Sequence, residues 1–180
     1  PDLFPKQNEK NRYWGFVNFF NKWEVTPIFT KVAPFRGNNA VVLKGTKYGV
    51  IDCKGQLVVP CKYDEIKDFS GGKAWARQGQ LWGLVNEGGV LLHPVVLTDV
   101  LAISRFSEAY WVENNAQWGM YDLSSNTYLF KPQFDSVNVL NHDMSLGVYQ
   151  GRYGLVSHQG QVTAKFTADT MYQVAPYRLA

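Results

Sequence analysis

Short runs of apolar residues alternate with turn-forming residues along the chain, and the runs recur at a nearly constant interval. Each run begins with an aromatic residue followed by glycine: Trp14 Gly15, Tyr48 Gly49, Trp82 Gly83, Trp118 Gly119 and Tyr153 Gly154. Successive glycines are 34, 34, 36 and 35 residues apart. Self-similarity at such a period is typical of repeat architectures. The sequence therefore contains five copies of one unit.

The units share an internal order of strands and turns. The apolar run after the glycine leads through a turn such as Lys54 Gly55 into a second apolar run, which indicates two antiparallel strands. We expect the second strand to close at a proline, because proline lacks the donor that a sheet ladder needs. That proline lies 11 to 13 residues after the glycine in four units, at Pro27, Pro60, Pro94 and Pro132, and Lys165 replaces it in the fifth.

The second half of each unit contributes a third strand. A turn of the Lys44 Gly45 type joins this strand to the next aromatic, so three strands form a meander. The segment from Tyr63 to Ile66 and its equivalents form a short fourth strand or a single helical turn. An aspartate recurs in this segment, at Asp64, Asp99, Asp135 and Asp169, and we expect it to accept hydrogen bonds from backbone N–H groups at a turn.

A sheet of about 35 residues cannot bury its apolar faces alone, so the units must stack on one another. We predict an all-β fold of five antiparallel meanders in one domain, with units at about 13–46, 47–80, 81–116, 117–151 and 152–180 after an N-terminal extension at 1–12. The units can stack as a small β-propeller-like ring or as an open β-solenoid. The ring is favoured because residues 172–179 could pair beside Trp14 and close it.

The second unit carries a family resemblance. Residues 48–89, YGVIDCKGQLVVPCKYDEIKDFSGGKAWARQGQLWGLVNEGG, resemble the WG-containing repeat of bacterial proteins, whose units run Trp-Gly, a strand, a Lys-Gly turn, an apolar strand, Pro and then Tyr-Asp-Glu. The likeness extends from Trp14 to Ala180 and is weaker in the first and fifth units. It implies a bacterial β-repeat scaffold, often attached to envelope or secreted proteins, and we expect that location rather than the cytoplasm. It implies no reaction and brings no catalytic residues.

Charge and composition exclude some classes of function. Lys and Arg number 18 and Asp and Glu 15, and this balance is too small to indicate a nucleic-acid-binding protein. The charge is uneven, with a net +6 over residues 1–77 and −3 over 78–180, which fits either an ordinary solvated surface or a docking patch for an acidic partner. No stretch approaches the roughly 18 apolar residues that a membrane span needs.

The residues that catalysis or metal binding would require lack the necessary spacing. The three histidines do not lie at metal-ligand spacing, and no nucleophile elbow or phosphate-binding loop occurs. Cys53 and Cys61 are too few for a metal site, and we expect unpaired thiols. We therefore predict no catalytic residues, no metal site and no cofactor, and we expect that the chain is not an enzyme.

Departures from the repeat are the remaining candidates for a site, since recurring residues are explained by the unit. The aromatic and glycine of each unit have a structural role in this interpretation. The nonrepeating aromatic and basic residues are Trp23, Arg36, Trp75, Arg77, Arg105, Tyr110 and Trp111, and all of them except Arg36 are candidate binding residues. Tyr110 and Trp111 are adjacent and point to opposite faces of a strand, so one should stay accessible.

These candidates support two hypotheses about function. Trp, Tyr and Arg often anchor protein interfaces, so the first is a noncatalytic scaffold that recognises another protein. The alternative is a carbohydrate or cell-wall glycan binder that stacks sugar rings on exposed aromatic faces. Packing between neighbouring sheets is the structural explanation for the same side chains.

Overall fold

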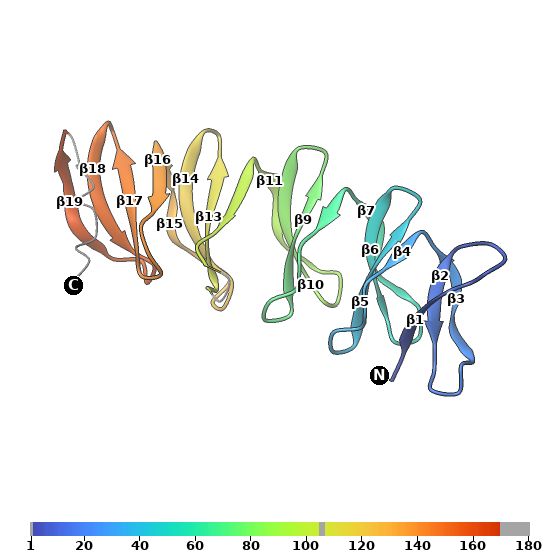
Figure 1. Cartoon of the computed structure of the whole chain (residues 1–180). Coiled ribbons are helices and arrows are strands. Elements are labelled where there is room, and N and C mark those ends of the chain that lie inside the picture. The colour runs from blue at the N-terminus through green and yellow to red at the C-terminus, as the bar shows by residue number, and fades with distance from the viewer. Residues whose placement is uncertain (1, 105–106, 170–180) are drawn as a thin grey trace, which may run out of the picture. The chain divides into compact units, whose positions relative to one another are not determined.

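The computed structural model describes residues 2–104 and 107–169, and all the regular elements of these residues are β-strands. Nineteen strands form five antiparallel sheets (Figure 1). The chain divides into two compact units, Pro1–Leu97 and Thr98–Ala180, which we describe in turn. The prediction of an all-β fold built of tandem antiparallel meanders is confirmed.

The first compact unit contains three sheets. In strand order, the first sheet is β1 (Phe4–Gln7), β2 (Trp14–Val17) and β3 (Trp23–Phe29). The second sheet is β4 (Lys31–Val32), β5 (Asn39–Lys44), β6 (Lys47–Asp52) and β7 (Leu57–Tyr63). The third sheet is β8 (Glu65–Ile66), β9 (Lys73–Gln78), β10 (Leu81–Asn86) and β11 (Leu91–Leu97).

The second compact unit contains two sheets of the same order. The fourth sheet is β12 (Asp99–Ala102), β13 (Ala109–Asn114), β14 (Gln117–Asp122) and β15 (Thr127–Phe134). The fifth sheet is β16 (Ser136–Val139), β17 (Met144–Tyr149), β18 (Arg152–Ser157) and β19 (Val162–Ala168).

Each four-stranded sheet combines strands from two consecutive sequence units. In the second sheet, β4 and β5 come from the first unit, whereas β6 and β7 come from the second. The segment that follows each proline-containing strand forms a short strand, as β8 does, and not the single helical turn that was the alternative prediction. In the first sheet, β1 from the predicted extension 1–12 occupies the edge of β2. Residues 172–179, predicted to pair beside Trp14 at that edge, lie outside the described residues.

A bulge opposite the motif glycine explains why glycine recurs there. Val50 pairs with Val59 and Tyr48 with Tyr63, so an advance of two residues along β6 corresponds to four residues along β7. The same register shift occurs in all five sheets. A Cβ on Gly49 would lie 2.7 Å from the carbonyl oxygen of Val59 and 2.9 Å from the nitrogen of Cys61. Only glycine leaves room for a backbone that approaches so closely.

The proline does not end the second strand, so that prediction is wrong. β7 runs from Leu57 to Tyr63 through Pro60, which lies in the bulge where the regular ladder is interrupted. A missing donor is tolerated at such a position. In the fifth sheet, where Lys165 replaces the proline, the ring of Phe166 fills the space above Gly154.

The two apolar residues after each motif glycine serve the two faces of the sheet. Val50 packs toward the third sheet and Ile51 toward the first, because successive residues of a strand alternate in direction. The cores between neighbouring sheets are Phe16, Val25, Phe29, Ala40, Val42 and Ile51; Val50, Val59, Tyr63, Ala74, Ala76 and Val85; and, in the second compact unit, Ile103, Ala109, Trp111, Met120, Phe134 and Val156. Within each compact unit, neighbouring sheets thus bury the apolar faces that they turn toward each other.

Candidate functional site

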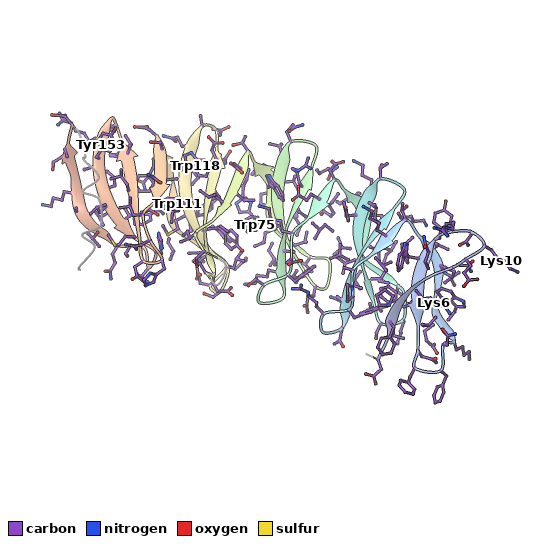
Figure 2. The ribbon with its side chains drawn as sticks, in the orientation of Figure 1. Lys6, Lys10, Trp75, Trp111, Trp118 and Tyr153 are labelled. Atoms are coloured by element: carbon purple, nitrogen blue, oxygen red, sulfur yellow. The ribbon has the colours of Figure 1, made fainter. Side chains whose placement is uncertain are left out.

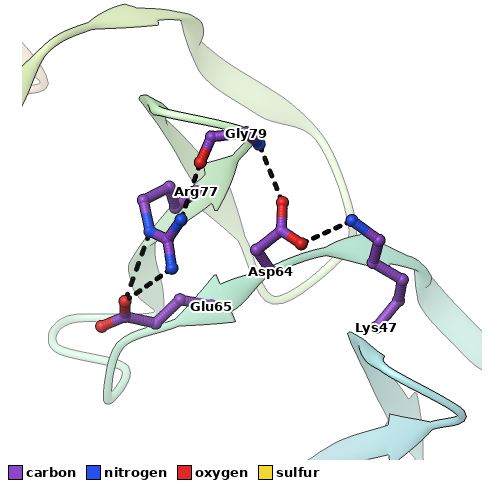
Figure 3. Close-up of polar contacts among 5 residues, drawn as sticks. All are labelled: Lys47, Asp64, Glu65, Arg77 and Gly79. Carbon is purple, nitrogen blue, oxygen red and sulfur yellow. Dashed lines mark hydrogen bonds and ion pairs between the residues drawn. The ribbon is translucent and has the colours of Figure 1, made fainter.

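Arg77, one of the predicted binding residues, is held within its own sheet. Its guanidinium lies 3.4 Å from Glu65 Oε2 and donates a hydrogen bond of 2.7 Å to the carbonyl oxygen of Gly79 (Figure 3). The same guanidinium lies 5.7 Å from the centre of the Trp82 ring, and Lys67 Nζ lies 4.6 Å from the same ring centre. Arg77 therefore covers the motif aromatic and fixes the turn between β9 and β10.

The recurring aspartate secures the same turn. Asp64 Oδ2 accepts a hydrogen bond of 2.8 Å from the N–H of Gly79, and Oδ1 lies 2.5 Å from Lys47 Nζ (Figure 3). The hydrogen bonds from Lys47 and Gly79 hold the pKa of Asp64 below its ordinary value. Asp135 accepts the equivalent bond from Gly151 at 3.0 Å. Asp64 and Asp135 thus bind backbone N–H groups at a turn, as the spacing predicts, whereas Asp99 accepts from the N–H of Val100 and Asp169 forms an ion pair with Arg152.

The structure corrects the expectation for the two candidate tryptophans. Trp75 is 2% exposed and Trp111 has no exposed surface, so neither ring can contact a partner (Figure 2). Trp111 packs edge-on against Phe134 with ring centres 5.6 Å apart. Tyr110, on the opposite face of β13, is half-buried, and burial and the charge of Glu108 raise the pKa of its phenol. Arg105 lies outside the described residues.

A buried chain of hydrogen bonds joins the fourth and fifth sheets. Trp111 Nε1 donates to Ser145 Oγ at 3.0 Å, and Ser145 Oγ lies 2.8 Å from His158 Nε2. His158 Nδ1 lies 2.8 Å from the carbonyl oxygen of His142. Because a carbonyl only accepts, Nδ1 carries a proton, and in the neutral imidazole Nε2 is then the acceptor to which the Ser145 hydroxyl donates. Every member of the chain is thereby satisfied.

The Ser145 and His158 pair has the spacing of a nucleophile and its base, but not the access. Nucleophilic catalysis needs a hydroxyl that a substrate can reach. Ser145 has no exposed surface, and its oxygen already accepts from Trp111. Sequence reasoning missed this pair because the two residues lie 13 positions apart, Ser145 on β17 and His158 in the turn after β18. The available signal was Ser145 itself, which stands where the second and third sheets have Ala40 and Ala74.

The described residues contain no group of three or more His, Cys, Asp or Glu side chains placed to hold a metal ion. Cys53 is exposed, Cys61 is partly buried, and both are free thiols. The same part of the chain contains no helix of the length and apolarity that a membrane crossing requires.

An exposed pair of phenylalanines lies at the turn between β2 and β3. Phe19 is 82% exposed and Phe20 is 87% exposed, with ring centres 6.1 Å apart at an interplanar angle of 87°. Asn18 organises the turn, since its Oδ1 accepts from the N–H groups of Phe20 and Lys22. Sequence reasoning did not single out these two rings. We call residues 18–22 the aromatic tip.

Trp23 is the candidate tryptophan with an accessible ring. It is half-buried and lines an open hollow of about 380 Å³ beside the β1–β2 connection. Lys6 Nζ lies 5.9 Å from the ring centre and donates a hydrogen bond of 2.7 Å to Asn21 Oδ1. The hollow is lined by Lys6, Gln7, Asn8, Glu9, Lys10 and Trp23, of which Lys6 and Lys10 are labelled in Figure 2.

Comparison with known proteins gives one family match. The family described as WG containing repeat matches residues 14–48 and again residues 48–82. A search of curated protein sequences found no match.

The solved structures with some similarity have low sequence identity. Kluyveromyces lactis Hsv2p matches with a TM-score of 0.45 and 15% identity over 90% of this chain and 56% of that chain. Its variant with loop 6CD replaced by a Gly-Ser linker matches with a TM-score of 0.42 and 14% identity over 90% and 58%. The extracellular domain of BT3049 from B. thetaiotaomicron matches with a TM-score of 0.36 and 10% identity over 94% and 27%. The chain thus spans a little over half the length of the Hsv2p chains that it matches.

Proposed function

We propose that the chain is a noncatalytic scaffold that recognises another protein, because residues 14–82 match the family described as WG containing repeat and the following sheets repeat their architecture. The aromatic tip carries this proposal. Large apolar side chains gathered on a protein surface are typical of interaction sites. Phe19 and Phe20 together expose more apolar surface than any other adjacent pair among the described residues with printed exposures.

The tip is already folded into the shape that a partner would receive. The N–H of Asn18 bonds to the carbonyl oxygen of Lys22, and the N–H of Asn21 bonds to that of Asn18. With Phe20 and Lys22 bonded to the Asn18 side chain, four N–H groups of the turn are satisfied internally. An ordered turn loses little conformational entropy on binding, and it leaves few polar groups to desolvate.

The two rings are large enough to dominate an interface. Burying one phenylalanine side chain contributes about 1.5–3 kcal/mol, so the pair would supply about 3–6 kcal/mol. At 1.4 kcal/mol for each tenfold change in affinity, this is on the order of a 100-fold to 10,000-fold effect.

The noncatalytic part of the proposal is supported by the positions of the reactive side chains. The one described Ser–His contact between side chains belongs to the buried chain between two sheets, and Arg77 and Asp64 are occupied at a turn. Each of these groups stabilises the repeat that contains it.

The proposal is tested with an affinity matrix that carries the intact protein and an extract of the cells that make it. A matrix that carries the Phe19→Ser/Phe20→Ser variant should no longer retain the partner protein. The partner purified from the wild-type eluate should bind this variant at least 100-fold more weakly than the wild type, as measured by calorimetry. Val90→Ser/Leu91→Ser is the matched control, because these adjacent residues are 57% and 47% exposed at the corresponding hairpin of the third sheet. Undiminished binding to the Phe19/Phe20 variant, or equal loss in the control, would contradict the proposal.

A further inference from the structure

The outer face of the first sheet differs from the faces on which repeats stack. In the second sheet, Ala40 pairs with Ile51 and Val42 with Gly49. The side chains of Ala40 and Val42 are buried against the first sheet. The third sheet has Ala74 and Ala76 at the same register positions. In these two sheets, stacking thus uses small or β-branched apolar residues at the two positions, and the fifth sheet has the small residues Ser145 and Gly147 there.

The first sheet places large or charged residues at the same two positions. Phe4 pairs with Val17 and Lys6 with Gly15, which are the registers of Ala40 and Val42 in the second sheet. Phe16 packs toward the second sheet, so the adjacent Val17 and the residues paired beside it belong to the opposite face. Burying the Lys6 ammonium under another repeat would cost several kcal/mol. This face is therefore built as a surface and not as a stacking face.

Trp23 is also unusual for its position on that face. Val17 pairs with Trp23, whereas the equivalent pairs are Ile51 with Leu57 and Val85 with Leu91. The large ring beside Lys6 therefore has no counterpart in the next two sheets, although the fourth sheet places Tyr128 at the equivalent position, paired with Tyr121.

The groups of the hollow have a definite chemistry. Gln7 Nε2 donates to the carbonyl oxygen of Arg12, and Asn8 Oδ1 accepts from the N–H of Lys10, so both amides serve to hold the connection. A flat indole ring, the ammonium of Lys10 and the carboxylate of Glu9 remain to meet a ligand, together with the N–H groups of the Lys6 ammonium that do not bond to Asn21. An indole face stacks on the C–H face of a pyranose, and an ammonium pairs with a carboxylate.

From these groups we infer that the hollow binds an acidic sugar, a pyranose that carries a carboxylate. Two lysines and one glutamate give the hollow a net charge of +1, which matches one carboxylate. Glu9 accepts hydrogen bonds from sugar hydroxyls and repels the closely spaced charges of a phosphate backbone. The geometry thus favours an acidic glycan over a nucleic acid, which also stacks its bases on aromatic rings. This inference goes beyond the proposed function and does not require the aromatic tip.

The test uses a tetramer of galacturonic acid as the probe, with binding to the whole protein measured by calorimetry. Trp23→Leu should weaken binding at least tenfold, and it should fold because leucine occupies the equivalent position in the next two sheets. Lys10→Gln should weaken binding about threefold or more, whereas Lys54→Gln at an exposed turn should not change it. The uncharged tetramer of galactose should bind at least tenfold more weakly than the acidic probe.

Several results would overturn the inference. No heat with the acidic tetramer up to 10 mM, or unchanged affinity in Trp23→Leu, would exclude the site. Equal affinity for the uncharged tetramer would show that the lysines do not recognise a carboxylate, and tighter binding of an eight-residue oligothymidylate would indicate a nucleic-acid site. Phe19→Ser/Phe20→Ser should keep the sugar affinity of the wild type, so this site and the proposed protein interface can fail independently.

Discussion

Replacing Ser145 by alanine should destabilise the second compact unit strongly for so small a change. Ser145 Oγ is the acceptor for Trp111 Nε1 and the donor to His158 Nε2. Ser145→Ala leaves both groups without that partner, and each unsatisfied buried group costs about 1–3 kcal/mol. Trp111 has no exposed surface, whereas His158 borders an open hollow from which water can reach it. We therefore expect a loss of about 2–4 kcal/mol.

A double-mutant cycle separates the hydrogen bond from other effects of the substitution. Trp111→Phe removes the donor while keeping a ring in the core, so the cost of Ser145→Ala should be smaller in that background. The expected coupling is about 1–2 kcal/mol, within the range found for residues that share one hydrogen-bonded network. Urea unfolding gives the free energies, and amide hydrogen exchange over residues 107–169 shows which unit has opened.

Two outcomes would refute this reasoning. Single losses that add to within about 0.5 kcal/mol in the double variant would mean that the Trp111–Ser145 hydrogen bond contributes nothing measurable. A cost of Ser145→Ala below about 0.5 kcal/mol would mean that water replaces the hydroxyl inside the core. Ser157→Ala is the control, because Ser157 Oγ accepts a single backbone N–H at the β18–β19 turn and should cost about 1 kcal/mol.

Three further predictions concern the repeat itself. Gly49→Ala places a methyl group against the bulge and should lower the free energy of unfolding by about 1–3 kcal/mol. Gly45→Ala should cost less, about 1 kcal/mol, because the new methyl group meets no other atom and only the φ of +61° is unfavourable for alanine. Equal losses in urea unfolding would refute the steric account. The lowered pKa of Asp64 means that its contribution to stability is present above the ordinary carboxyl pKa and is lost as the pH falls through the folded value. The stability difference between wild type and Asp64→Asn should thus shrink at acidic pH, and a difference that stays constant from pH 7 to pH 3 would contradict it. An aromatic disulfide reagent should label the exposed Cys53 faster than Cys61, since burial raises the pKa of the Cys61 thiol; equal labelling rates would count against the partial burial of Cys61.

The functional surfaces were only partly accessible to sequence reasoning. Trp23 was among the candidate residues, but its placement beside Lys6 depends on the pairing of β1 with β2. The sequence of residues 1–12 does not show that this segment forms a strand on the first sheet. Phe19 and Phe20 lie in a turn, and a turn pattern does not say whether its side chains fold back or point into solvent. Exposure at such positions follows from the path of the chain and not from residue type.

The candidates inside the sheets failed for a different reason. Trp75 and Trp111 stand out in the sequence because the repeat does not require them, yet both are buried. The alternation of a strand correctly separates Tyr110 from Trp111, but it does not say which of the two faces another sheet. That choice is made by the neighbouring sheet, where Ser145 accepts the Trp111 N–H.

The sequence by itself determined the period of the repeat, the antiparallel strands, the tight turns and the role of two of the four recurring aspartates, Asp64 and Asp135, which bind turn amides. These features are local, since they depend on residues within one unit and on the alternation of apolar positions. Only the tertiary structure decided which strands share a sheet, that the strand continues through the proline as a bulge, and which aromatic rings reach the surface. Those features depend on contacts between units, because a side chain is buried or exposed according to what the fold brings against it.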